Sequence, residues 1–230
     1  MRLILRPIDA YNKRLLYLKA ERILMFTGII EAVGKIQRIA PLEAGLCLDI
    51  SPGTLKLCDV EIGHSIAVNG VCLTVTALAN GMFSVDVSRE TLSCTEGLDK
   101  QDGRVNLEQA MRLSDRIGGH LVSGHVDGVG EVVKFEPVGE NHLLVIRVPP
   151  SLSRYIVKKG SITVNGVSLT VNTMAADEFE ANLIRHTLAM TTLNELKAGA
   201  KVNLEVDMLA RYVEQLMDHS MNRVEPESGS

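Results

Sequence analysis

Histidine, thiol and hydroxyl side chains occur at positions of this chain that correspond between its two halves, but the residue type differs from one half to the other. Such side chains can transfer protons, so the two halves are expected to carry two similar sites. His125 corresponds to Ile29, and Ser168 corresponds to Cys72, with each pair 96 positions apart. Histidine carries protons near neutral pH, so His125 is a candidate acid or base. Drift after a duplication explains any single difference, but the differences gather at the same strand ends and turns. Together they favour two related pockets with different roles.

Other polar positions extend this comparison between the two halves. The residue types that differ are Gly63 and Lys159, His64 and Gly160, Asp86 and Asn182, Ser88 and Ile184, and Glu90 and His186. The types that are kept are Ser65 and Ser161, Thr74 and Thr170, Arg89 and Arg185, and Thr91 and Thr187.

Metal and nucleophilic sites are less favoured by the residue pattern. His120 and His125 lie five positions apart, but no third ligand is indicated and no cysteine is near them, so no metal is predicted. Cys72, in the middle of an apolar run, is more typical of a buried thiol than of a nucleophile. Phosphate-binding and dinucleotide motifs are absent, and Gly128-Val129-Gly130 is only a weak glycine signal. Spacing alone therefore indicates two domains with related small-molecule pockets.

A tandem repeat must position these residues. The stretch from Val68 to Val75 returns at 164–171 with seven of its eight residues identical. Val105-Asn106-Leu107-Glu108 returns at 202–205, one position late, which indicates a single insertion before it. The repeat period of roughly 96 residues exceeds the ~20–50 residues of solenoid repeats, so each copy is expected to be a domain with its own core.

Composition excludes several kinds of partner and location. The formal charge of −4, the aromatic content of 3% and the absence of tryptophan argue against nucleic acid. The four cysteines all lie in the first copy, which is not the pattern of a duplicated disulfide framework, so reduced thiols and a cytoplasmic location are expected. Apolar runs are too short for a membrane helix, so no membrane partner is predicted.

The fold predicted is mainly β: two tandem homologous six-stranded antiparallel Greek-key barrels plus a C-terminal α-helix. Short apolar runs separated by glycine and Asn-Gly turns predict these strands, and Asn80-Gly81 is a strong hairpin signal. The segment 106–119 is expected to form one or two helical turns between the copies. The strands expected in the first copy are 28–36, 46–50, 65–68, 72–78, 83–87 and 104–108, with a short helix at 89–95.

The predicted boundaries are a first barrel with its linker at 25–120 and a second barrel at 121–207, followed by a helix at 208–219 and a disordered tail at 220–230. Residues 1–24 form an N-terminal extension, read either as a basic targeting segment or as sequence upstream of a natural start at Met25. The apolar stripe of the terminal helix either packs on the chain's own barrels or forms an oligomer interface, and we favour the interface.

Three long motifs, Met25 to Glu31, Asn69 to Val75 and Gly118 to Val126, together resemble the alpha-chain type of riboflavin synthase over essentially all of 25–217. The resemblance implies dismutation of two molecules of 6,7-dimethyl-8-ribityllumazine by four-carbon transfer, giving riboflavin and 5-amino-6-ribitylamino-uracil. It implies no metal or redox cofactor, a homotrimer held by the C-terminal helices, and association with lumazine synthase. The active site would form between the first barrel of one subunit and the second barrel of a neighbour.

The resemblance also assigns site residues. Phe26, Ser65, Cys72, His125 and Asp207 match positions associated with catalysis. Ligand contacts expected in the first barrel are Gly28, Ile29, Ile30, Cys72, Leu73, Thr74, Asp86, Val87, Ser88, Arg89, Glu90 and Thr91. Those expected in the second barrel are Gly124, His125, Val126, Lys159, Ser168, Leu169, Thr170, Asn182, Leu183, Ile184, Arg185, His186 and Thr187.

The sequence leaves two alternatives to catalysis. One is a non-catalytic lumazine- or flavin-binding homologue, and the presence of His125, Lys159, Ser168 and Thr187 counts against it. The other is a structural interaction module, which would not need paired polar residues at strand ends.

The substitution His125→Ile tests the difference between the copies, because it gives the second copy the residue type of the first. Folding should be nearly preserved, whereas turnover should fall by ~10²–10⁴ if His125 transfers a proton. Ser168→Cys is the control and should cost less, since a thiol still fits. Wild-type turnover by His125→Ile, with ligand bound in both pockets, would remove His125 from the mechanism.

Overall fold

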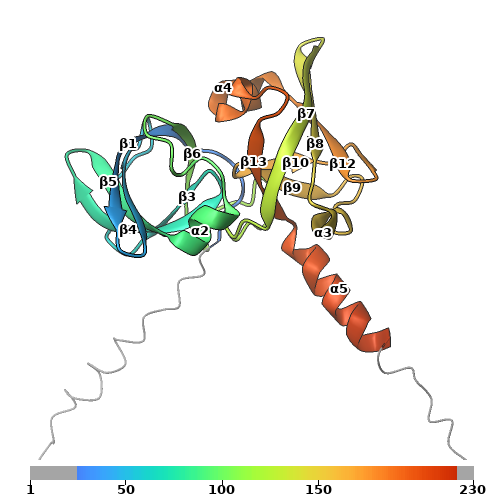
Figure 1. Cartoon of the computed structure of the whole chain (residues 1–230), viewed down its shortest axis with the longest axis horizontal. Coiled ribbons are helices and arrows are strands. Elements are labelled where there is room, and N and C mark those ends of the chain that lie inside the picture. The colour runs from blue at the N-terminus through green and yellow to red at the C-terminus, as the bar shows by residue number, and fades with distance from the viewer. Residues whose placement is uncertain (1–24, 222–230) are drawn as a thin grey trace, which may run out of the picture.

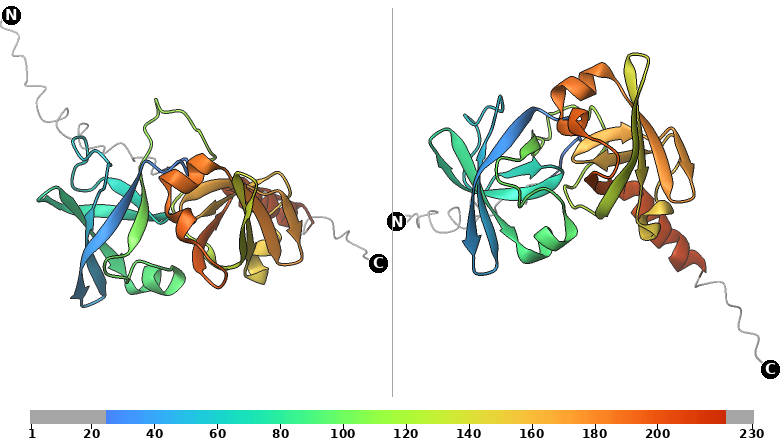
Figure 2. Two further views of the ribbon diagram at one scale, coloured as in Figure 1. Left: turned by 90° about the horizontal axis from the view of Figure 1, so that it is seen from above. Right: turned by 45° about the horizontal axis from the view of Figure 1, so that its top comes forward.

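The computed structural model describes residues 25–221, with side chains described as far as Met217. A closed β-barrel and a curled second β-sheet, called the second barrel below, lie side by side, and a long helix, α5, extends away from the second barrel (Figures 1 and 2). The predicted N-terminal extension, 1–24, and most of the predicted tail lie outside the described residues. Within 25–221, no helix has the length and apolar character needed to cross a membrane.

The first barrel is closed and antiparallel, with its strands in the order β1-β2-β5-β4-β3-β6. Strands β3, β4 and β5 follow one another as hairpins, and β2 returns by a long connection to lie beside β5, which is a Greek key. Closure leaves the barrel without a free sheet edge. The strands are β1 (Ala32–Leu42), β2 (Gly45–Ser51), β3 (Ser65–Val68), β4 (Val71–Ala79), β5 (Met82–Ser88) and β6 (Arg104–Gln109).

The second copy repeats this plan but contains seven strands, in the order β10-β9-β13-β7-β8-β12-β11. The counterpart of β4 is divided into β10 and β11, which stand at the two ends of the curled sheet. The division falls where β4 has a bulge, between Val75 and Ala77. The strands are β7 (Gly128–Val138), β8 (Asn141–Arg147), β9 (Ser161–Val164), β10 (Val167–Thr170), β11 (Thr173–Ala175), β12 (Glu178–Leu183) and β13 (Lys201–Val206).

Within residues 25–221, helices are short except for the last one. The helix α5 (Met208–Met221) ends two residues beyond the predicted end, so positions 220 and 221 are helical and not part of a tail. The remaining helices are α2 (Arg89–Cys94), α3 (Pro150–Ser153), α4 (Arg185–Met190) and the 3₁₀ turn η1 (Thr192–Glu195).

Each barrel has its own core, as the repeat predicts. Phe83, Ile50 and Leu107 are fully buried in the first core, and Phe179, Ile146 and Leu204 are fully buried in the second. These residues alternate along their strands with residues on the outer face, because successive side chains of a strand point to opposite sides. Burial of each such side chain stabilises the fold by roughly 1.5–3 kcal/mol.

Two local predictions differ from the structure. The segment 106–119 is not helical: residues 106–109 complete β6, and Ala110 and Met111 donate backbone hydrogen bonds to Ser65 and Met25. The first strand begins at Ala32 and not at Gly28, because residues 26–30 leave the first barrel. The Asn80-Gly81 hairpin is confirmed, with positive φ angles of 53° and 72° at its two central residues.

The two barrels meet through their Asn-Gly turns. A side-chain carbon on Gly166 would lie 2.8 Å from the backbone nitrogen of Gly70, and one on Gly70 would lie 2.7 Å from that of Gly166. Two buried asparagines join the turns to the opposite barrel: Asn106 donates to the Asn165 carbonyl at 2.9 Å, and Asn203 donates to the Asn69 carbonyl at 3.0 Å. The contact therefore has approximate two-fold symmetry.

The substitution Gly166→Ala should destabilise the protein more than Gly81→Ala, because both glycines have positive φ but only Gly166 is crowded. Gly81 has no neighbour within 4 Å of an added carbon, so its substitution should cost only about 1 kcal/mol of backbone strain. Overpacking against the other barrel should add about 1–3 kcal/mol for Gly166→Ala. Urea unfolding measures both values, and equal losses would show that the turn contact is not tight in solution.

Candidate active site

Two crossing segments run between the barrels. The first crossing segment is residues 26–30 and the second is residues 122–126. They pair with each other through Phe26 and Val122, whose backbones exchange hydrogen bonds of 2.8 and 3.0 Å. Each segment precedes the first strand of its own barrel.

Beyond this pairing, each crossing segment adds itself to the opposite barrel. The Ser168 backbone nitrogen donates to the Gly28 carbonyl at 2.8 Å, and the Cys72 nitrogen donates to the Gly124 carbonyl at 2.8 Å. Ile30 packs on the core of the second barrel, and Val126 packs on the core of the first. The expected grouping of site residues is therefore wrong in one respect, since residues 28–30 lie beside Ser168 and residues 124–126 lie beside Cys72.

Strand alternation decides which predicted contacts can present a side chain. Cys72, Thr74, Asp86 and Ser88 occupy outer-face positions on β4 and β5, and Ser168, Thr170 and Asn182 occupy the equivalent positions on β10 and β12. Leu73, Val87, Leu169 and Leu183 are core residues, exposed by 7% or less, so a bound molecule can meet only their backbone. Ile29 and His125 are both exposed, each at the fourth of the five positions of its crossing segment.

The surroundings of Cys72 are largely apolar. Phe26, Ala67 and Val122 form a small buried cluster against which Cys72 packs. Burial raises the pKa of the Cys72 thiol, with Ser65 opposing this effect and the Glu205 carboxylate adding to it. A thiol with a raised pKa stays protonated at neutral pH, which disfavours Cys72 as a nucleophile.

The surroundings of Ser168 are polar. The Nδ1 atom of His120 lies 2.8 Å from the Ser168 hydroxyl oxygen, at hydrogen-bonding distance. Burial lowers the pKa of His120, and the Asp207 carboxylate opposes this effect. The other ring nitrogen of His120 and the buried Thr163 hydroxyl meet no hydrogen-bond partner within residues 25–221. A neutral imidazole beside a hydroxyl is an arrangement suited to proton transfer.

His120 is not among the site residues predicted from the sequence, where it is a candidate only for a metal ligand. Its counterpart by the 96-residue offset is Leu24, just before the first family motif. Comparing the two copies one residue before Met25 reveals that the second copy has a histidine where the first has a leucine.

Known proteins share this architecture. The lumazine binding domain matches this chain twice, at residues 27–110 and 123–207. Riboflavin synthase of Photobacterium phosphoreum is 48% identical over 194 residues, which cover 84% of this chain and 89% of that protein. The chain belongs to the riboflavin synthase family. Riboflavin synthase of Bacillus subtilis (strain 168) is 43% identical over 199 residues, covering 86% of this chain and 92% of that protein.

Solved structures of a lumazine-binding protein, LumP, also resemble this member of the riboflavin synthase family. LumP complexed with 6,7-dimethyl-8-(1'-D-ribityl) lumazine aligns with a TM-score of 0.71, and LumP complexed with riboflavin aligns with a TM-score of 0.73. Both are 26% identical and cover 79% of this chain and 98% of LumP.

The five residues expected to act in catalysis do not share one environment. Phe26 and Ser65 are buried, with 0% and 3% of their surface exposed, so they support the surface from beneath. His125 is exposed on the second crossing segment. Asp207 joins β13 to α5, where its carboxylate accepts a hydrogen bond from the Leu209 nitrogen at 3.0 Å.

The residues at the ends of β5 and β12 begin the helices α2 and α4. The Arg89 guanidinium donates to the Glu43 carbonyl at 2.7 Å, and Arg185 forms an ion pair with Glu140. In both copies the retained arginine therefore holds the first hairpin of its barrel. Glu90, Thr91, His186 and Thr187 follow on these helices, and Ile184, 54% exposed, precedes α4.

Lys159 has a backbone conformation that favours glycine. Its φ angle is +69°, and its counterpart Gly63 has φ +90°. Both residues donate the same backbone hydrogen bond, from Lys159 to Val171 and from Gly63 to Val75, each at 2.8 Å. A left-handed conformation costs a residue with a side chain about 1 kcal/mol, so the exposed lysine is kept at some cost to stability.

The substitution Lys159→Gly gives the second copy the residue type of the first and relieves this strain. The free energy of unfolding should stay unchanged or rise by up to about 1 kcal/mol, because glycine adopts the turn without a clash. Turnover should fall at the same time if the ammonium group contacts a bound molecule. Lys158→Gly, at the neighbouring exposed position, is the matched control; a variant at Lys159 with full turnover would assign this lysine no role at the site.

Proposed function

We propose that this protein is a catalytically active riboflavin synthase, which converts two molecules of 6,7-dimethyl-8-ribityllumazine into riboflavin and 5-amino-6-ribitylamino-uracil. One molecule gives a four-carbon unit to the other, so the reaction balances without an external oxidant or reductant. The observation that carries the proposal is the pair of equivalent surfaces around Cys72 and Ser168, which have one frame and different polar groups. Its relatives with 43–48% identity bear the name riboflavin synthase.

The chemistry requires positioning more than strong acid–base catalysis. The 7-methyl group of the lumazine is acidic, because its carbanion is delocalised into the pteridine ring. Outer-face hydroxyl and amide groups such as Thr74, Thr170 and Asn182 would orient the two ring systems and their ribityl chains. Two substrates held against each other react as one complex, which supplies a large entropic advantage.

The Ser168 side is the better candidate for removing the methyl proton. Ser168 Oγ would accept the proton from the 7-methyl carbon while its own hydroxyl proton passes to Nδ1 of His120. The nearby Asp207 carboxylate favours the resulting imidazolium. His125 and Lys159 would contact the second substrate, and Ser65 and Cys72 would shape its pocket.

A cofactor-free assay tests the proposed function. Purified protein mixed with 6,7-dimethyl-8-ribityllumazine alone should produce riboflavin at half the molar amount of lumazine consumed. Lumazine binding without riboflavin would favour the non-catalytic alternative, for which the likeness to LumP at 26% identity is the supporting observation. Absence of binding would leave only a structural role.

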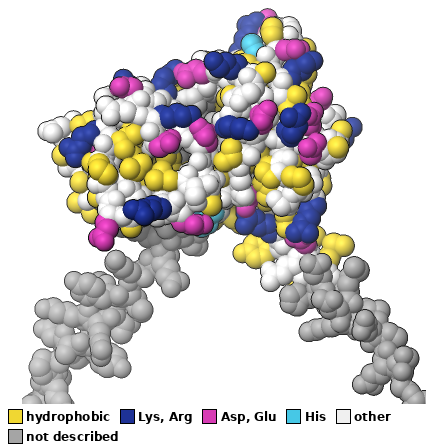
Figure 3. Space-filling model, viewed as in Figure 1, with side chains coloured by type: hydrophobic (Ala, Val, Ile, Leu, Met, Phe, Trp, Pro, Cys, Tyr) yellow, Lys and Arg dark blue, Asp and Glu magenta, His cyan; other side chains and the backbone are white. Residues whose placement is uncertain are grey.

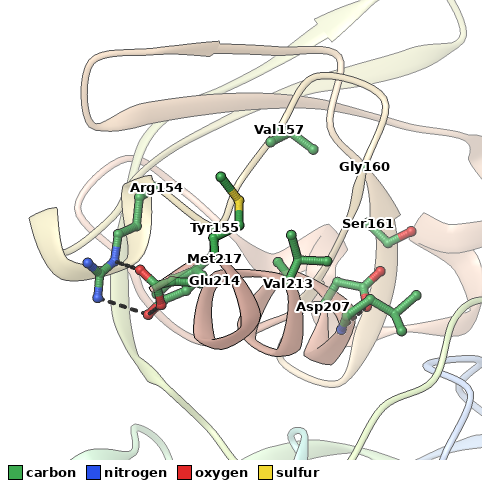
Figure 4. A pocket seen from close by; sticks show the side chains of 11 residues that line it. Arg154, Tyr155, Val157, Gly160, Ser161, Asp207, Val213, Glu214 and Met217 are labelled. Atoms are coloured by element: carbon green, nitrogen blue, oxygen red, sulfur yellow. Dashed lines mark hydrogen bonds and ion pairs between the residues drawn. The ribbon is translucent and has the colours of Figure 1, made fainter. Parts of the chain in front are cut away.

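The helix α5 supports the proposal of a homotrimer. Leu209, Tyr212, Val213, Leu216 and Met217 expose 54–72% of their surface, so the chain's own barrels do not bury the apolar stripe (Figure 3). The helix is held to the segment that follows α3 by Glu214, which binds Arg154 and Tyr155. Beside the helix lies a groove of about 550 Å³ (Figure 4). Helices of neighbouring subunits would cover these apolar surfaces. Association with lumazine synthase and a cytoplasmic location belong to the same proposal.

The substitution Leu216→Glu tests the helix as an interface. Leu216 is 72% exposed, so a charge there should leave the barrels folded but separate the subunits, because burying a leucine contributes roughly 1.5–3 kcal/mol per contact. Leu113→Glu is the matched control, since Leu113 is 91% exposed in the linker. Sedimentation should show monomers for Leu216→Glu but not for Leu113→Glu, and the activity assay should show little turnover for Leu216→Glu. An intact, active trimer of Leu216→Glu would exclude the helix from the interface.

A further inference from the structure

Two buried carboxylates occupy equivalent places in the closing strands of the barrels. Glu108 on β6 and Glu205 on β13 are each only 4% exposed. They are 97 positions apart, which is the offset that the single insertion gives to this strand. Both copies therefore keep a glutamate directly after three buried positions of the closing strand.

Each carboxylate holds the crossing segment of its own barrel with the same three hydrogen bonds. One oxygen of Glu108 accepts from the Thr27 nitrogen and hydroxyl, both at 2.7 Å, and the other accepts from the Gly28 nitrogen at 3.0 Å. One oxygen of Glu205 accepts from the Ser123 nitrogen at 2.6 Å and hydroxyl at 2.7 Å, and the other accepts from the Gly124 nitrogen at 2.9 Å.

Hydrogen-bond donors alone satisfy these carboxylates, since neither forms an ion pair within the described residues 25–221. Burial raises the pKa of Glu108 to about 7, with the donors at Thr27 and Gly28 opposing it and the Glu31 carboxylate adding to it. Burial likewise raises the pKa of Glu205. An ionised group without a counter-charge is costly to bury, so two of them are an expensive way to achieve stability alone.

The consequence lies in the opposite barrel. Gly28, held by Glu108, is the residue whose carbonyl binds the Ser168 nitrogen, and Gly124, held by Glu205, binds the Cys72 nitrogen. We propose that Glu108 and Glu205 are crossed positioning residues: Glu108 of the first barrel sets the pocket at Ser168, and Glu205 of the second barrel sets the pocket at Cys72. This inference rests on the proposed function, because it concerns how the two lumazine molecules are held.

The substitutions Glu108→Gln and Glu205→Gln test this crossing. Glutamine has the same size, and its amide oxygen can still accept from Thr27 or Ser123. Its amide nitrogen is a donor that would face the donor of Gly28 or Gly124, so the segment should loosen while the barrel remains closed. Thr27→Val and Ser123→Ala remove a hydroxyl that donates to the glutamate and accepts from the Ile29 or His125 nitrogen at 3.3 Å. They leave the carboxylate in place and give a second test if the glutamine variants fold poorly. Glu136→Gln, at an exposed position of β7, is the matched control.

The measurement is binding of lumazine labelled with carbon-13 at the 7-methyl group, observed by NMR in the full-length protein at low temperature, before the lumazine is consumed. Wild type should show two bound signals, and Ser168→Ala and Cys72→Ala assign each signal to its pocket. Glu108→Gln should weaken binding at the Ser168 pocket at least tenfold and leave the Cys72 pocket within twofold. Glu205→Gln should show the reverse, and Glu136→Gln should match wild type. The inference is wrong if each glutamine variant loses affinity at the pocket of its own barrel, which is the Cys72 pocket for Glu108 and the Ser168 pocket for Glu205. Equal losses of affinity at both pockets, or no loss, would also overturn it.

The pH dependence supplies a second readout that a purely structural role would not give. As pH falls through about 7, Glu108 takes up a proton and one of its oxygens becomes a donor, so affinity at the Ser168 pocket should fall in wild type. In Glu108→Gln this acid-side loss should disappear; if it persists unchanged, Glu108 does not cause it.

Failure of this inference is distinguishable from failure of the proposed function. A wild type that forms riboflavin but lacks the crossed pattern refutes only the positioning roles. A wild type that binds two lumazines and shows the crossed pattern without forming riboflavin refutes only the catalysis. Absence of lumazine binding to wild type would refute both.

Discussion

The backbone of the Asn69-Gly70 turn lies against that of Asn165-Gly166 so closely that neither glycine has room for a side-chain carbon. This contact sets the distance between the barrels, and the buried side chains of Asn106 and Asn203 fix it by hydrogen bonds across the junction. Only at such a short distance can each crossing segment leave its own barrel and bind the other. The positions of both crossing segments thus depend on the contact between Gly70 and Gly166.

In the two copies, the inner faces of the strands stay alike while some residues on the outer faces differ. Inner-face positions keep apolar residues in both copies, because each barrel needs a closed core. The outer faces are free to diverge, and there Cys72 meets an apolar cluster while Ser168 meets His120. Lys159 extends this divergence into the backbone, since a lysine occupies a left-handed turn that the first copy fills with glycine.

Sequence alone predicted the elements well and their partners poorly. Alternation and Asn-Gly turns placed β3 at its observed limits and most other strands within a few residues, because these signals are local. Nothing local distinguishes a strand that stays in its barrel from one that crosses to the other. The predicted first strand therefore includes residues 28–31, whereas in the structure Glu108 binds Thr27 and Gly28 and holds them apart from β1. The 106–119 segment is predicted to contain one or two helical turns, but pairing with β1 and β3 extends β6 through Gln109. Helical periodicity predicted α5, whereas its exposure depends on the whole fold.

The proposed dismutation requires that two identical molecules meet two different environments, and this architecture would provide the difference at a small structural cost. Perfectly equal pockets would bind both lumazines alike, and neither would be favoured as donor of the four-carbon unit. Here the approximate two-fold axis runs between the Asn-Gly turns, so the cores and crossing segments can remain symmetric while a few outer-face residues break the symmetry. Because each crossing segment belongs to one barrel and lines the other, the two environments stay mechanically linked even as their chemistry diverges. That linkage allows polar residues such as Cys72 and Ser168, beside the crossing segments, to differ between the copies while both segments stay anchored.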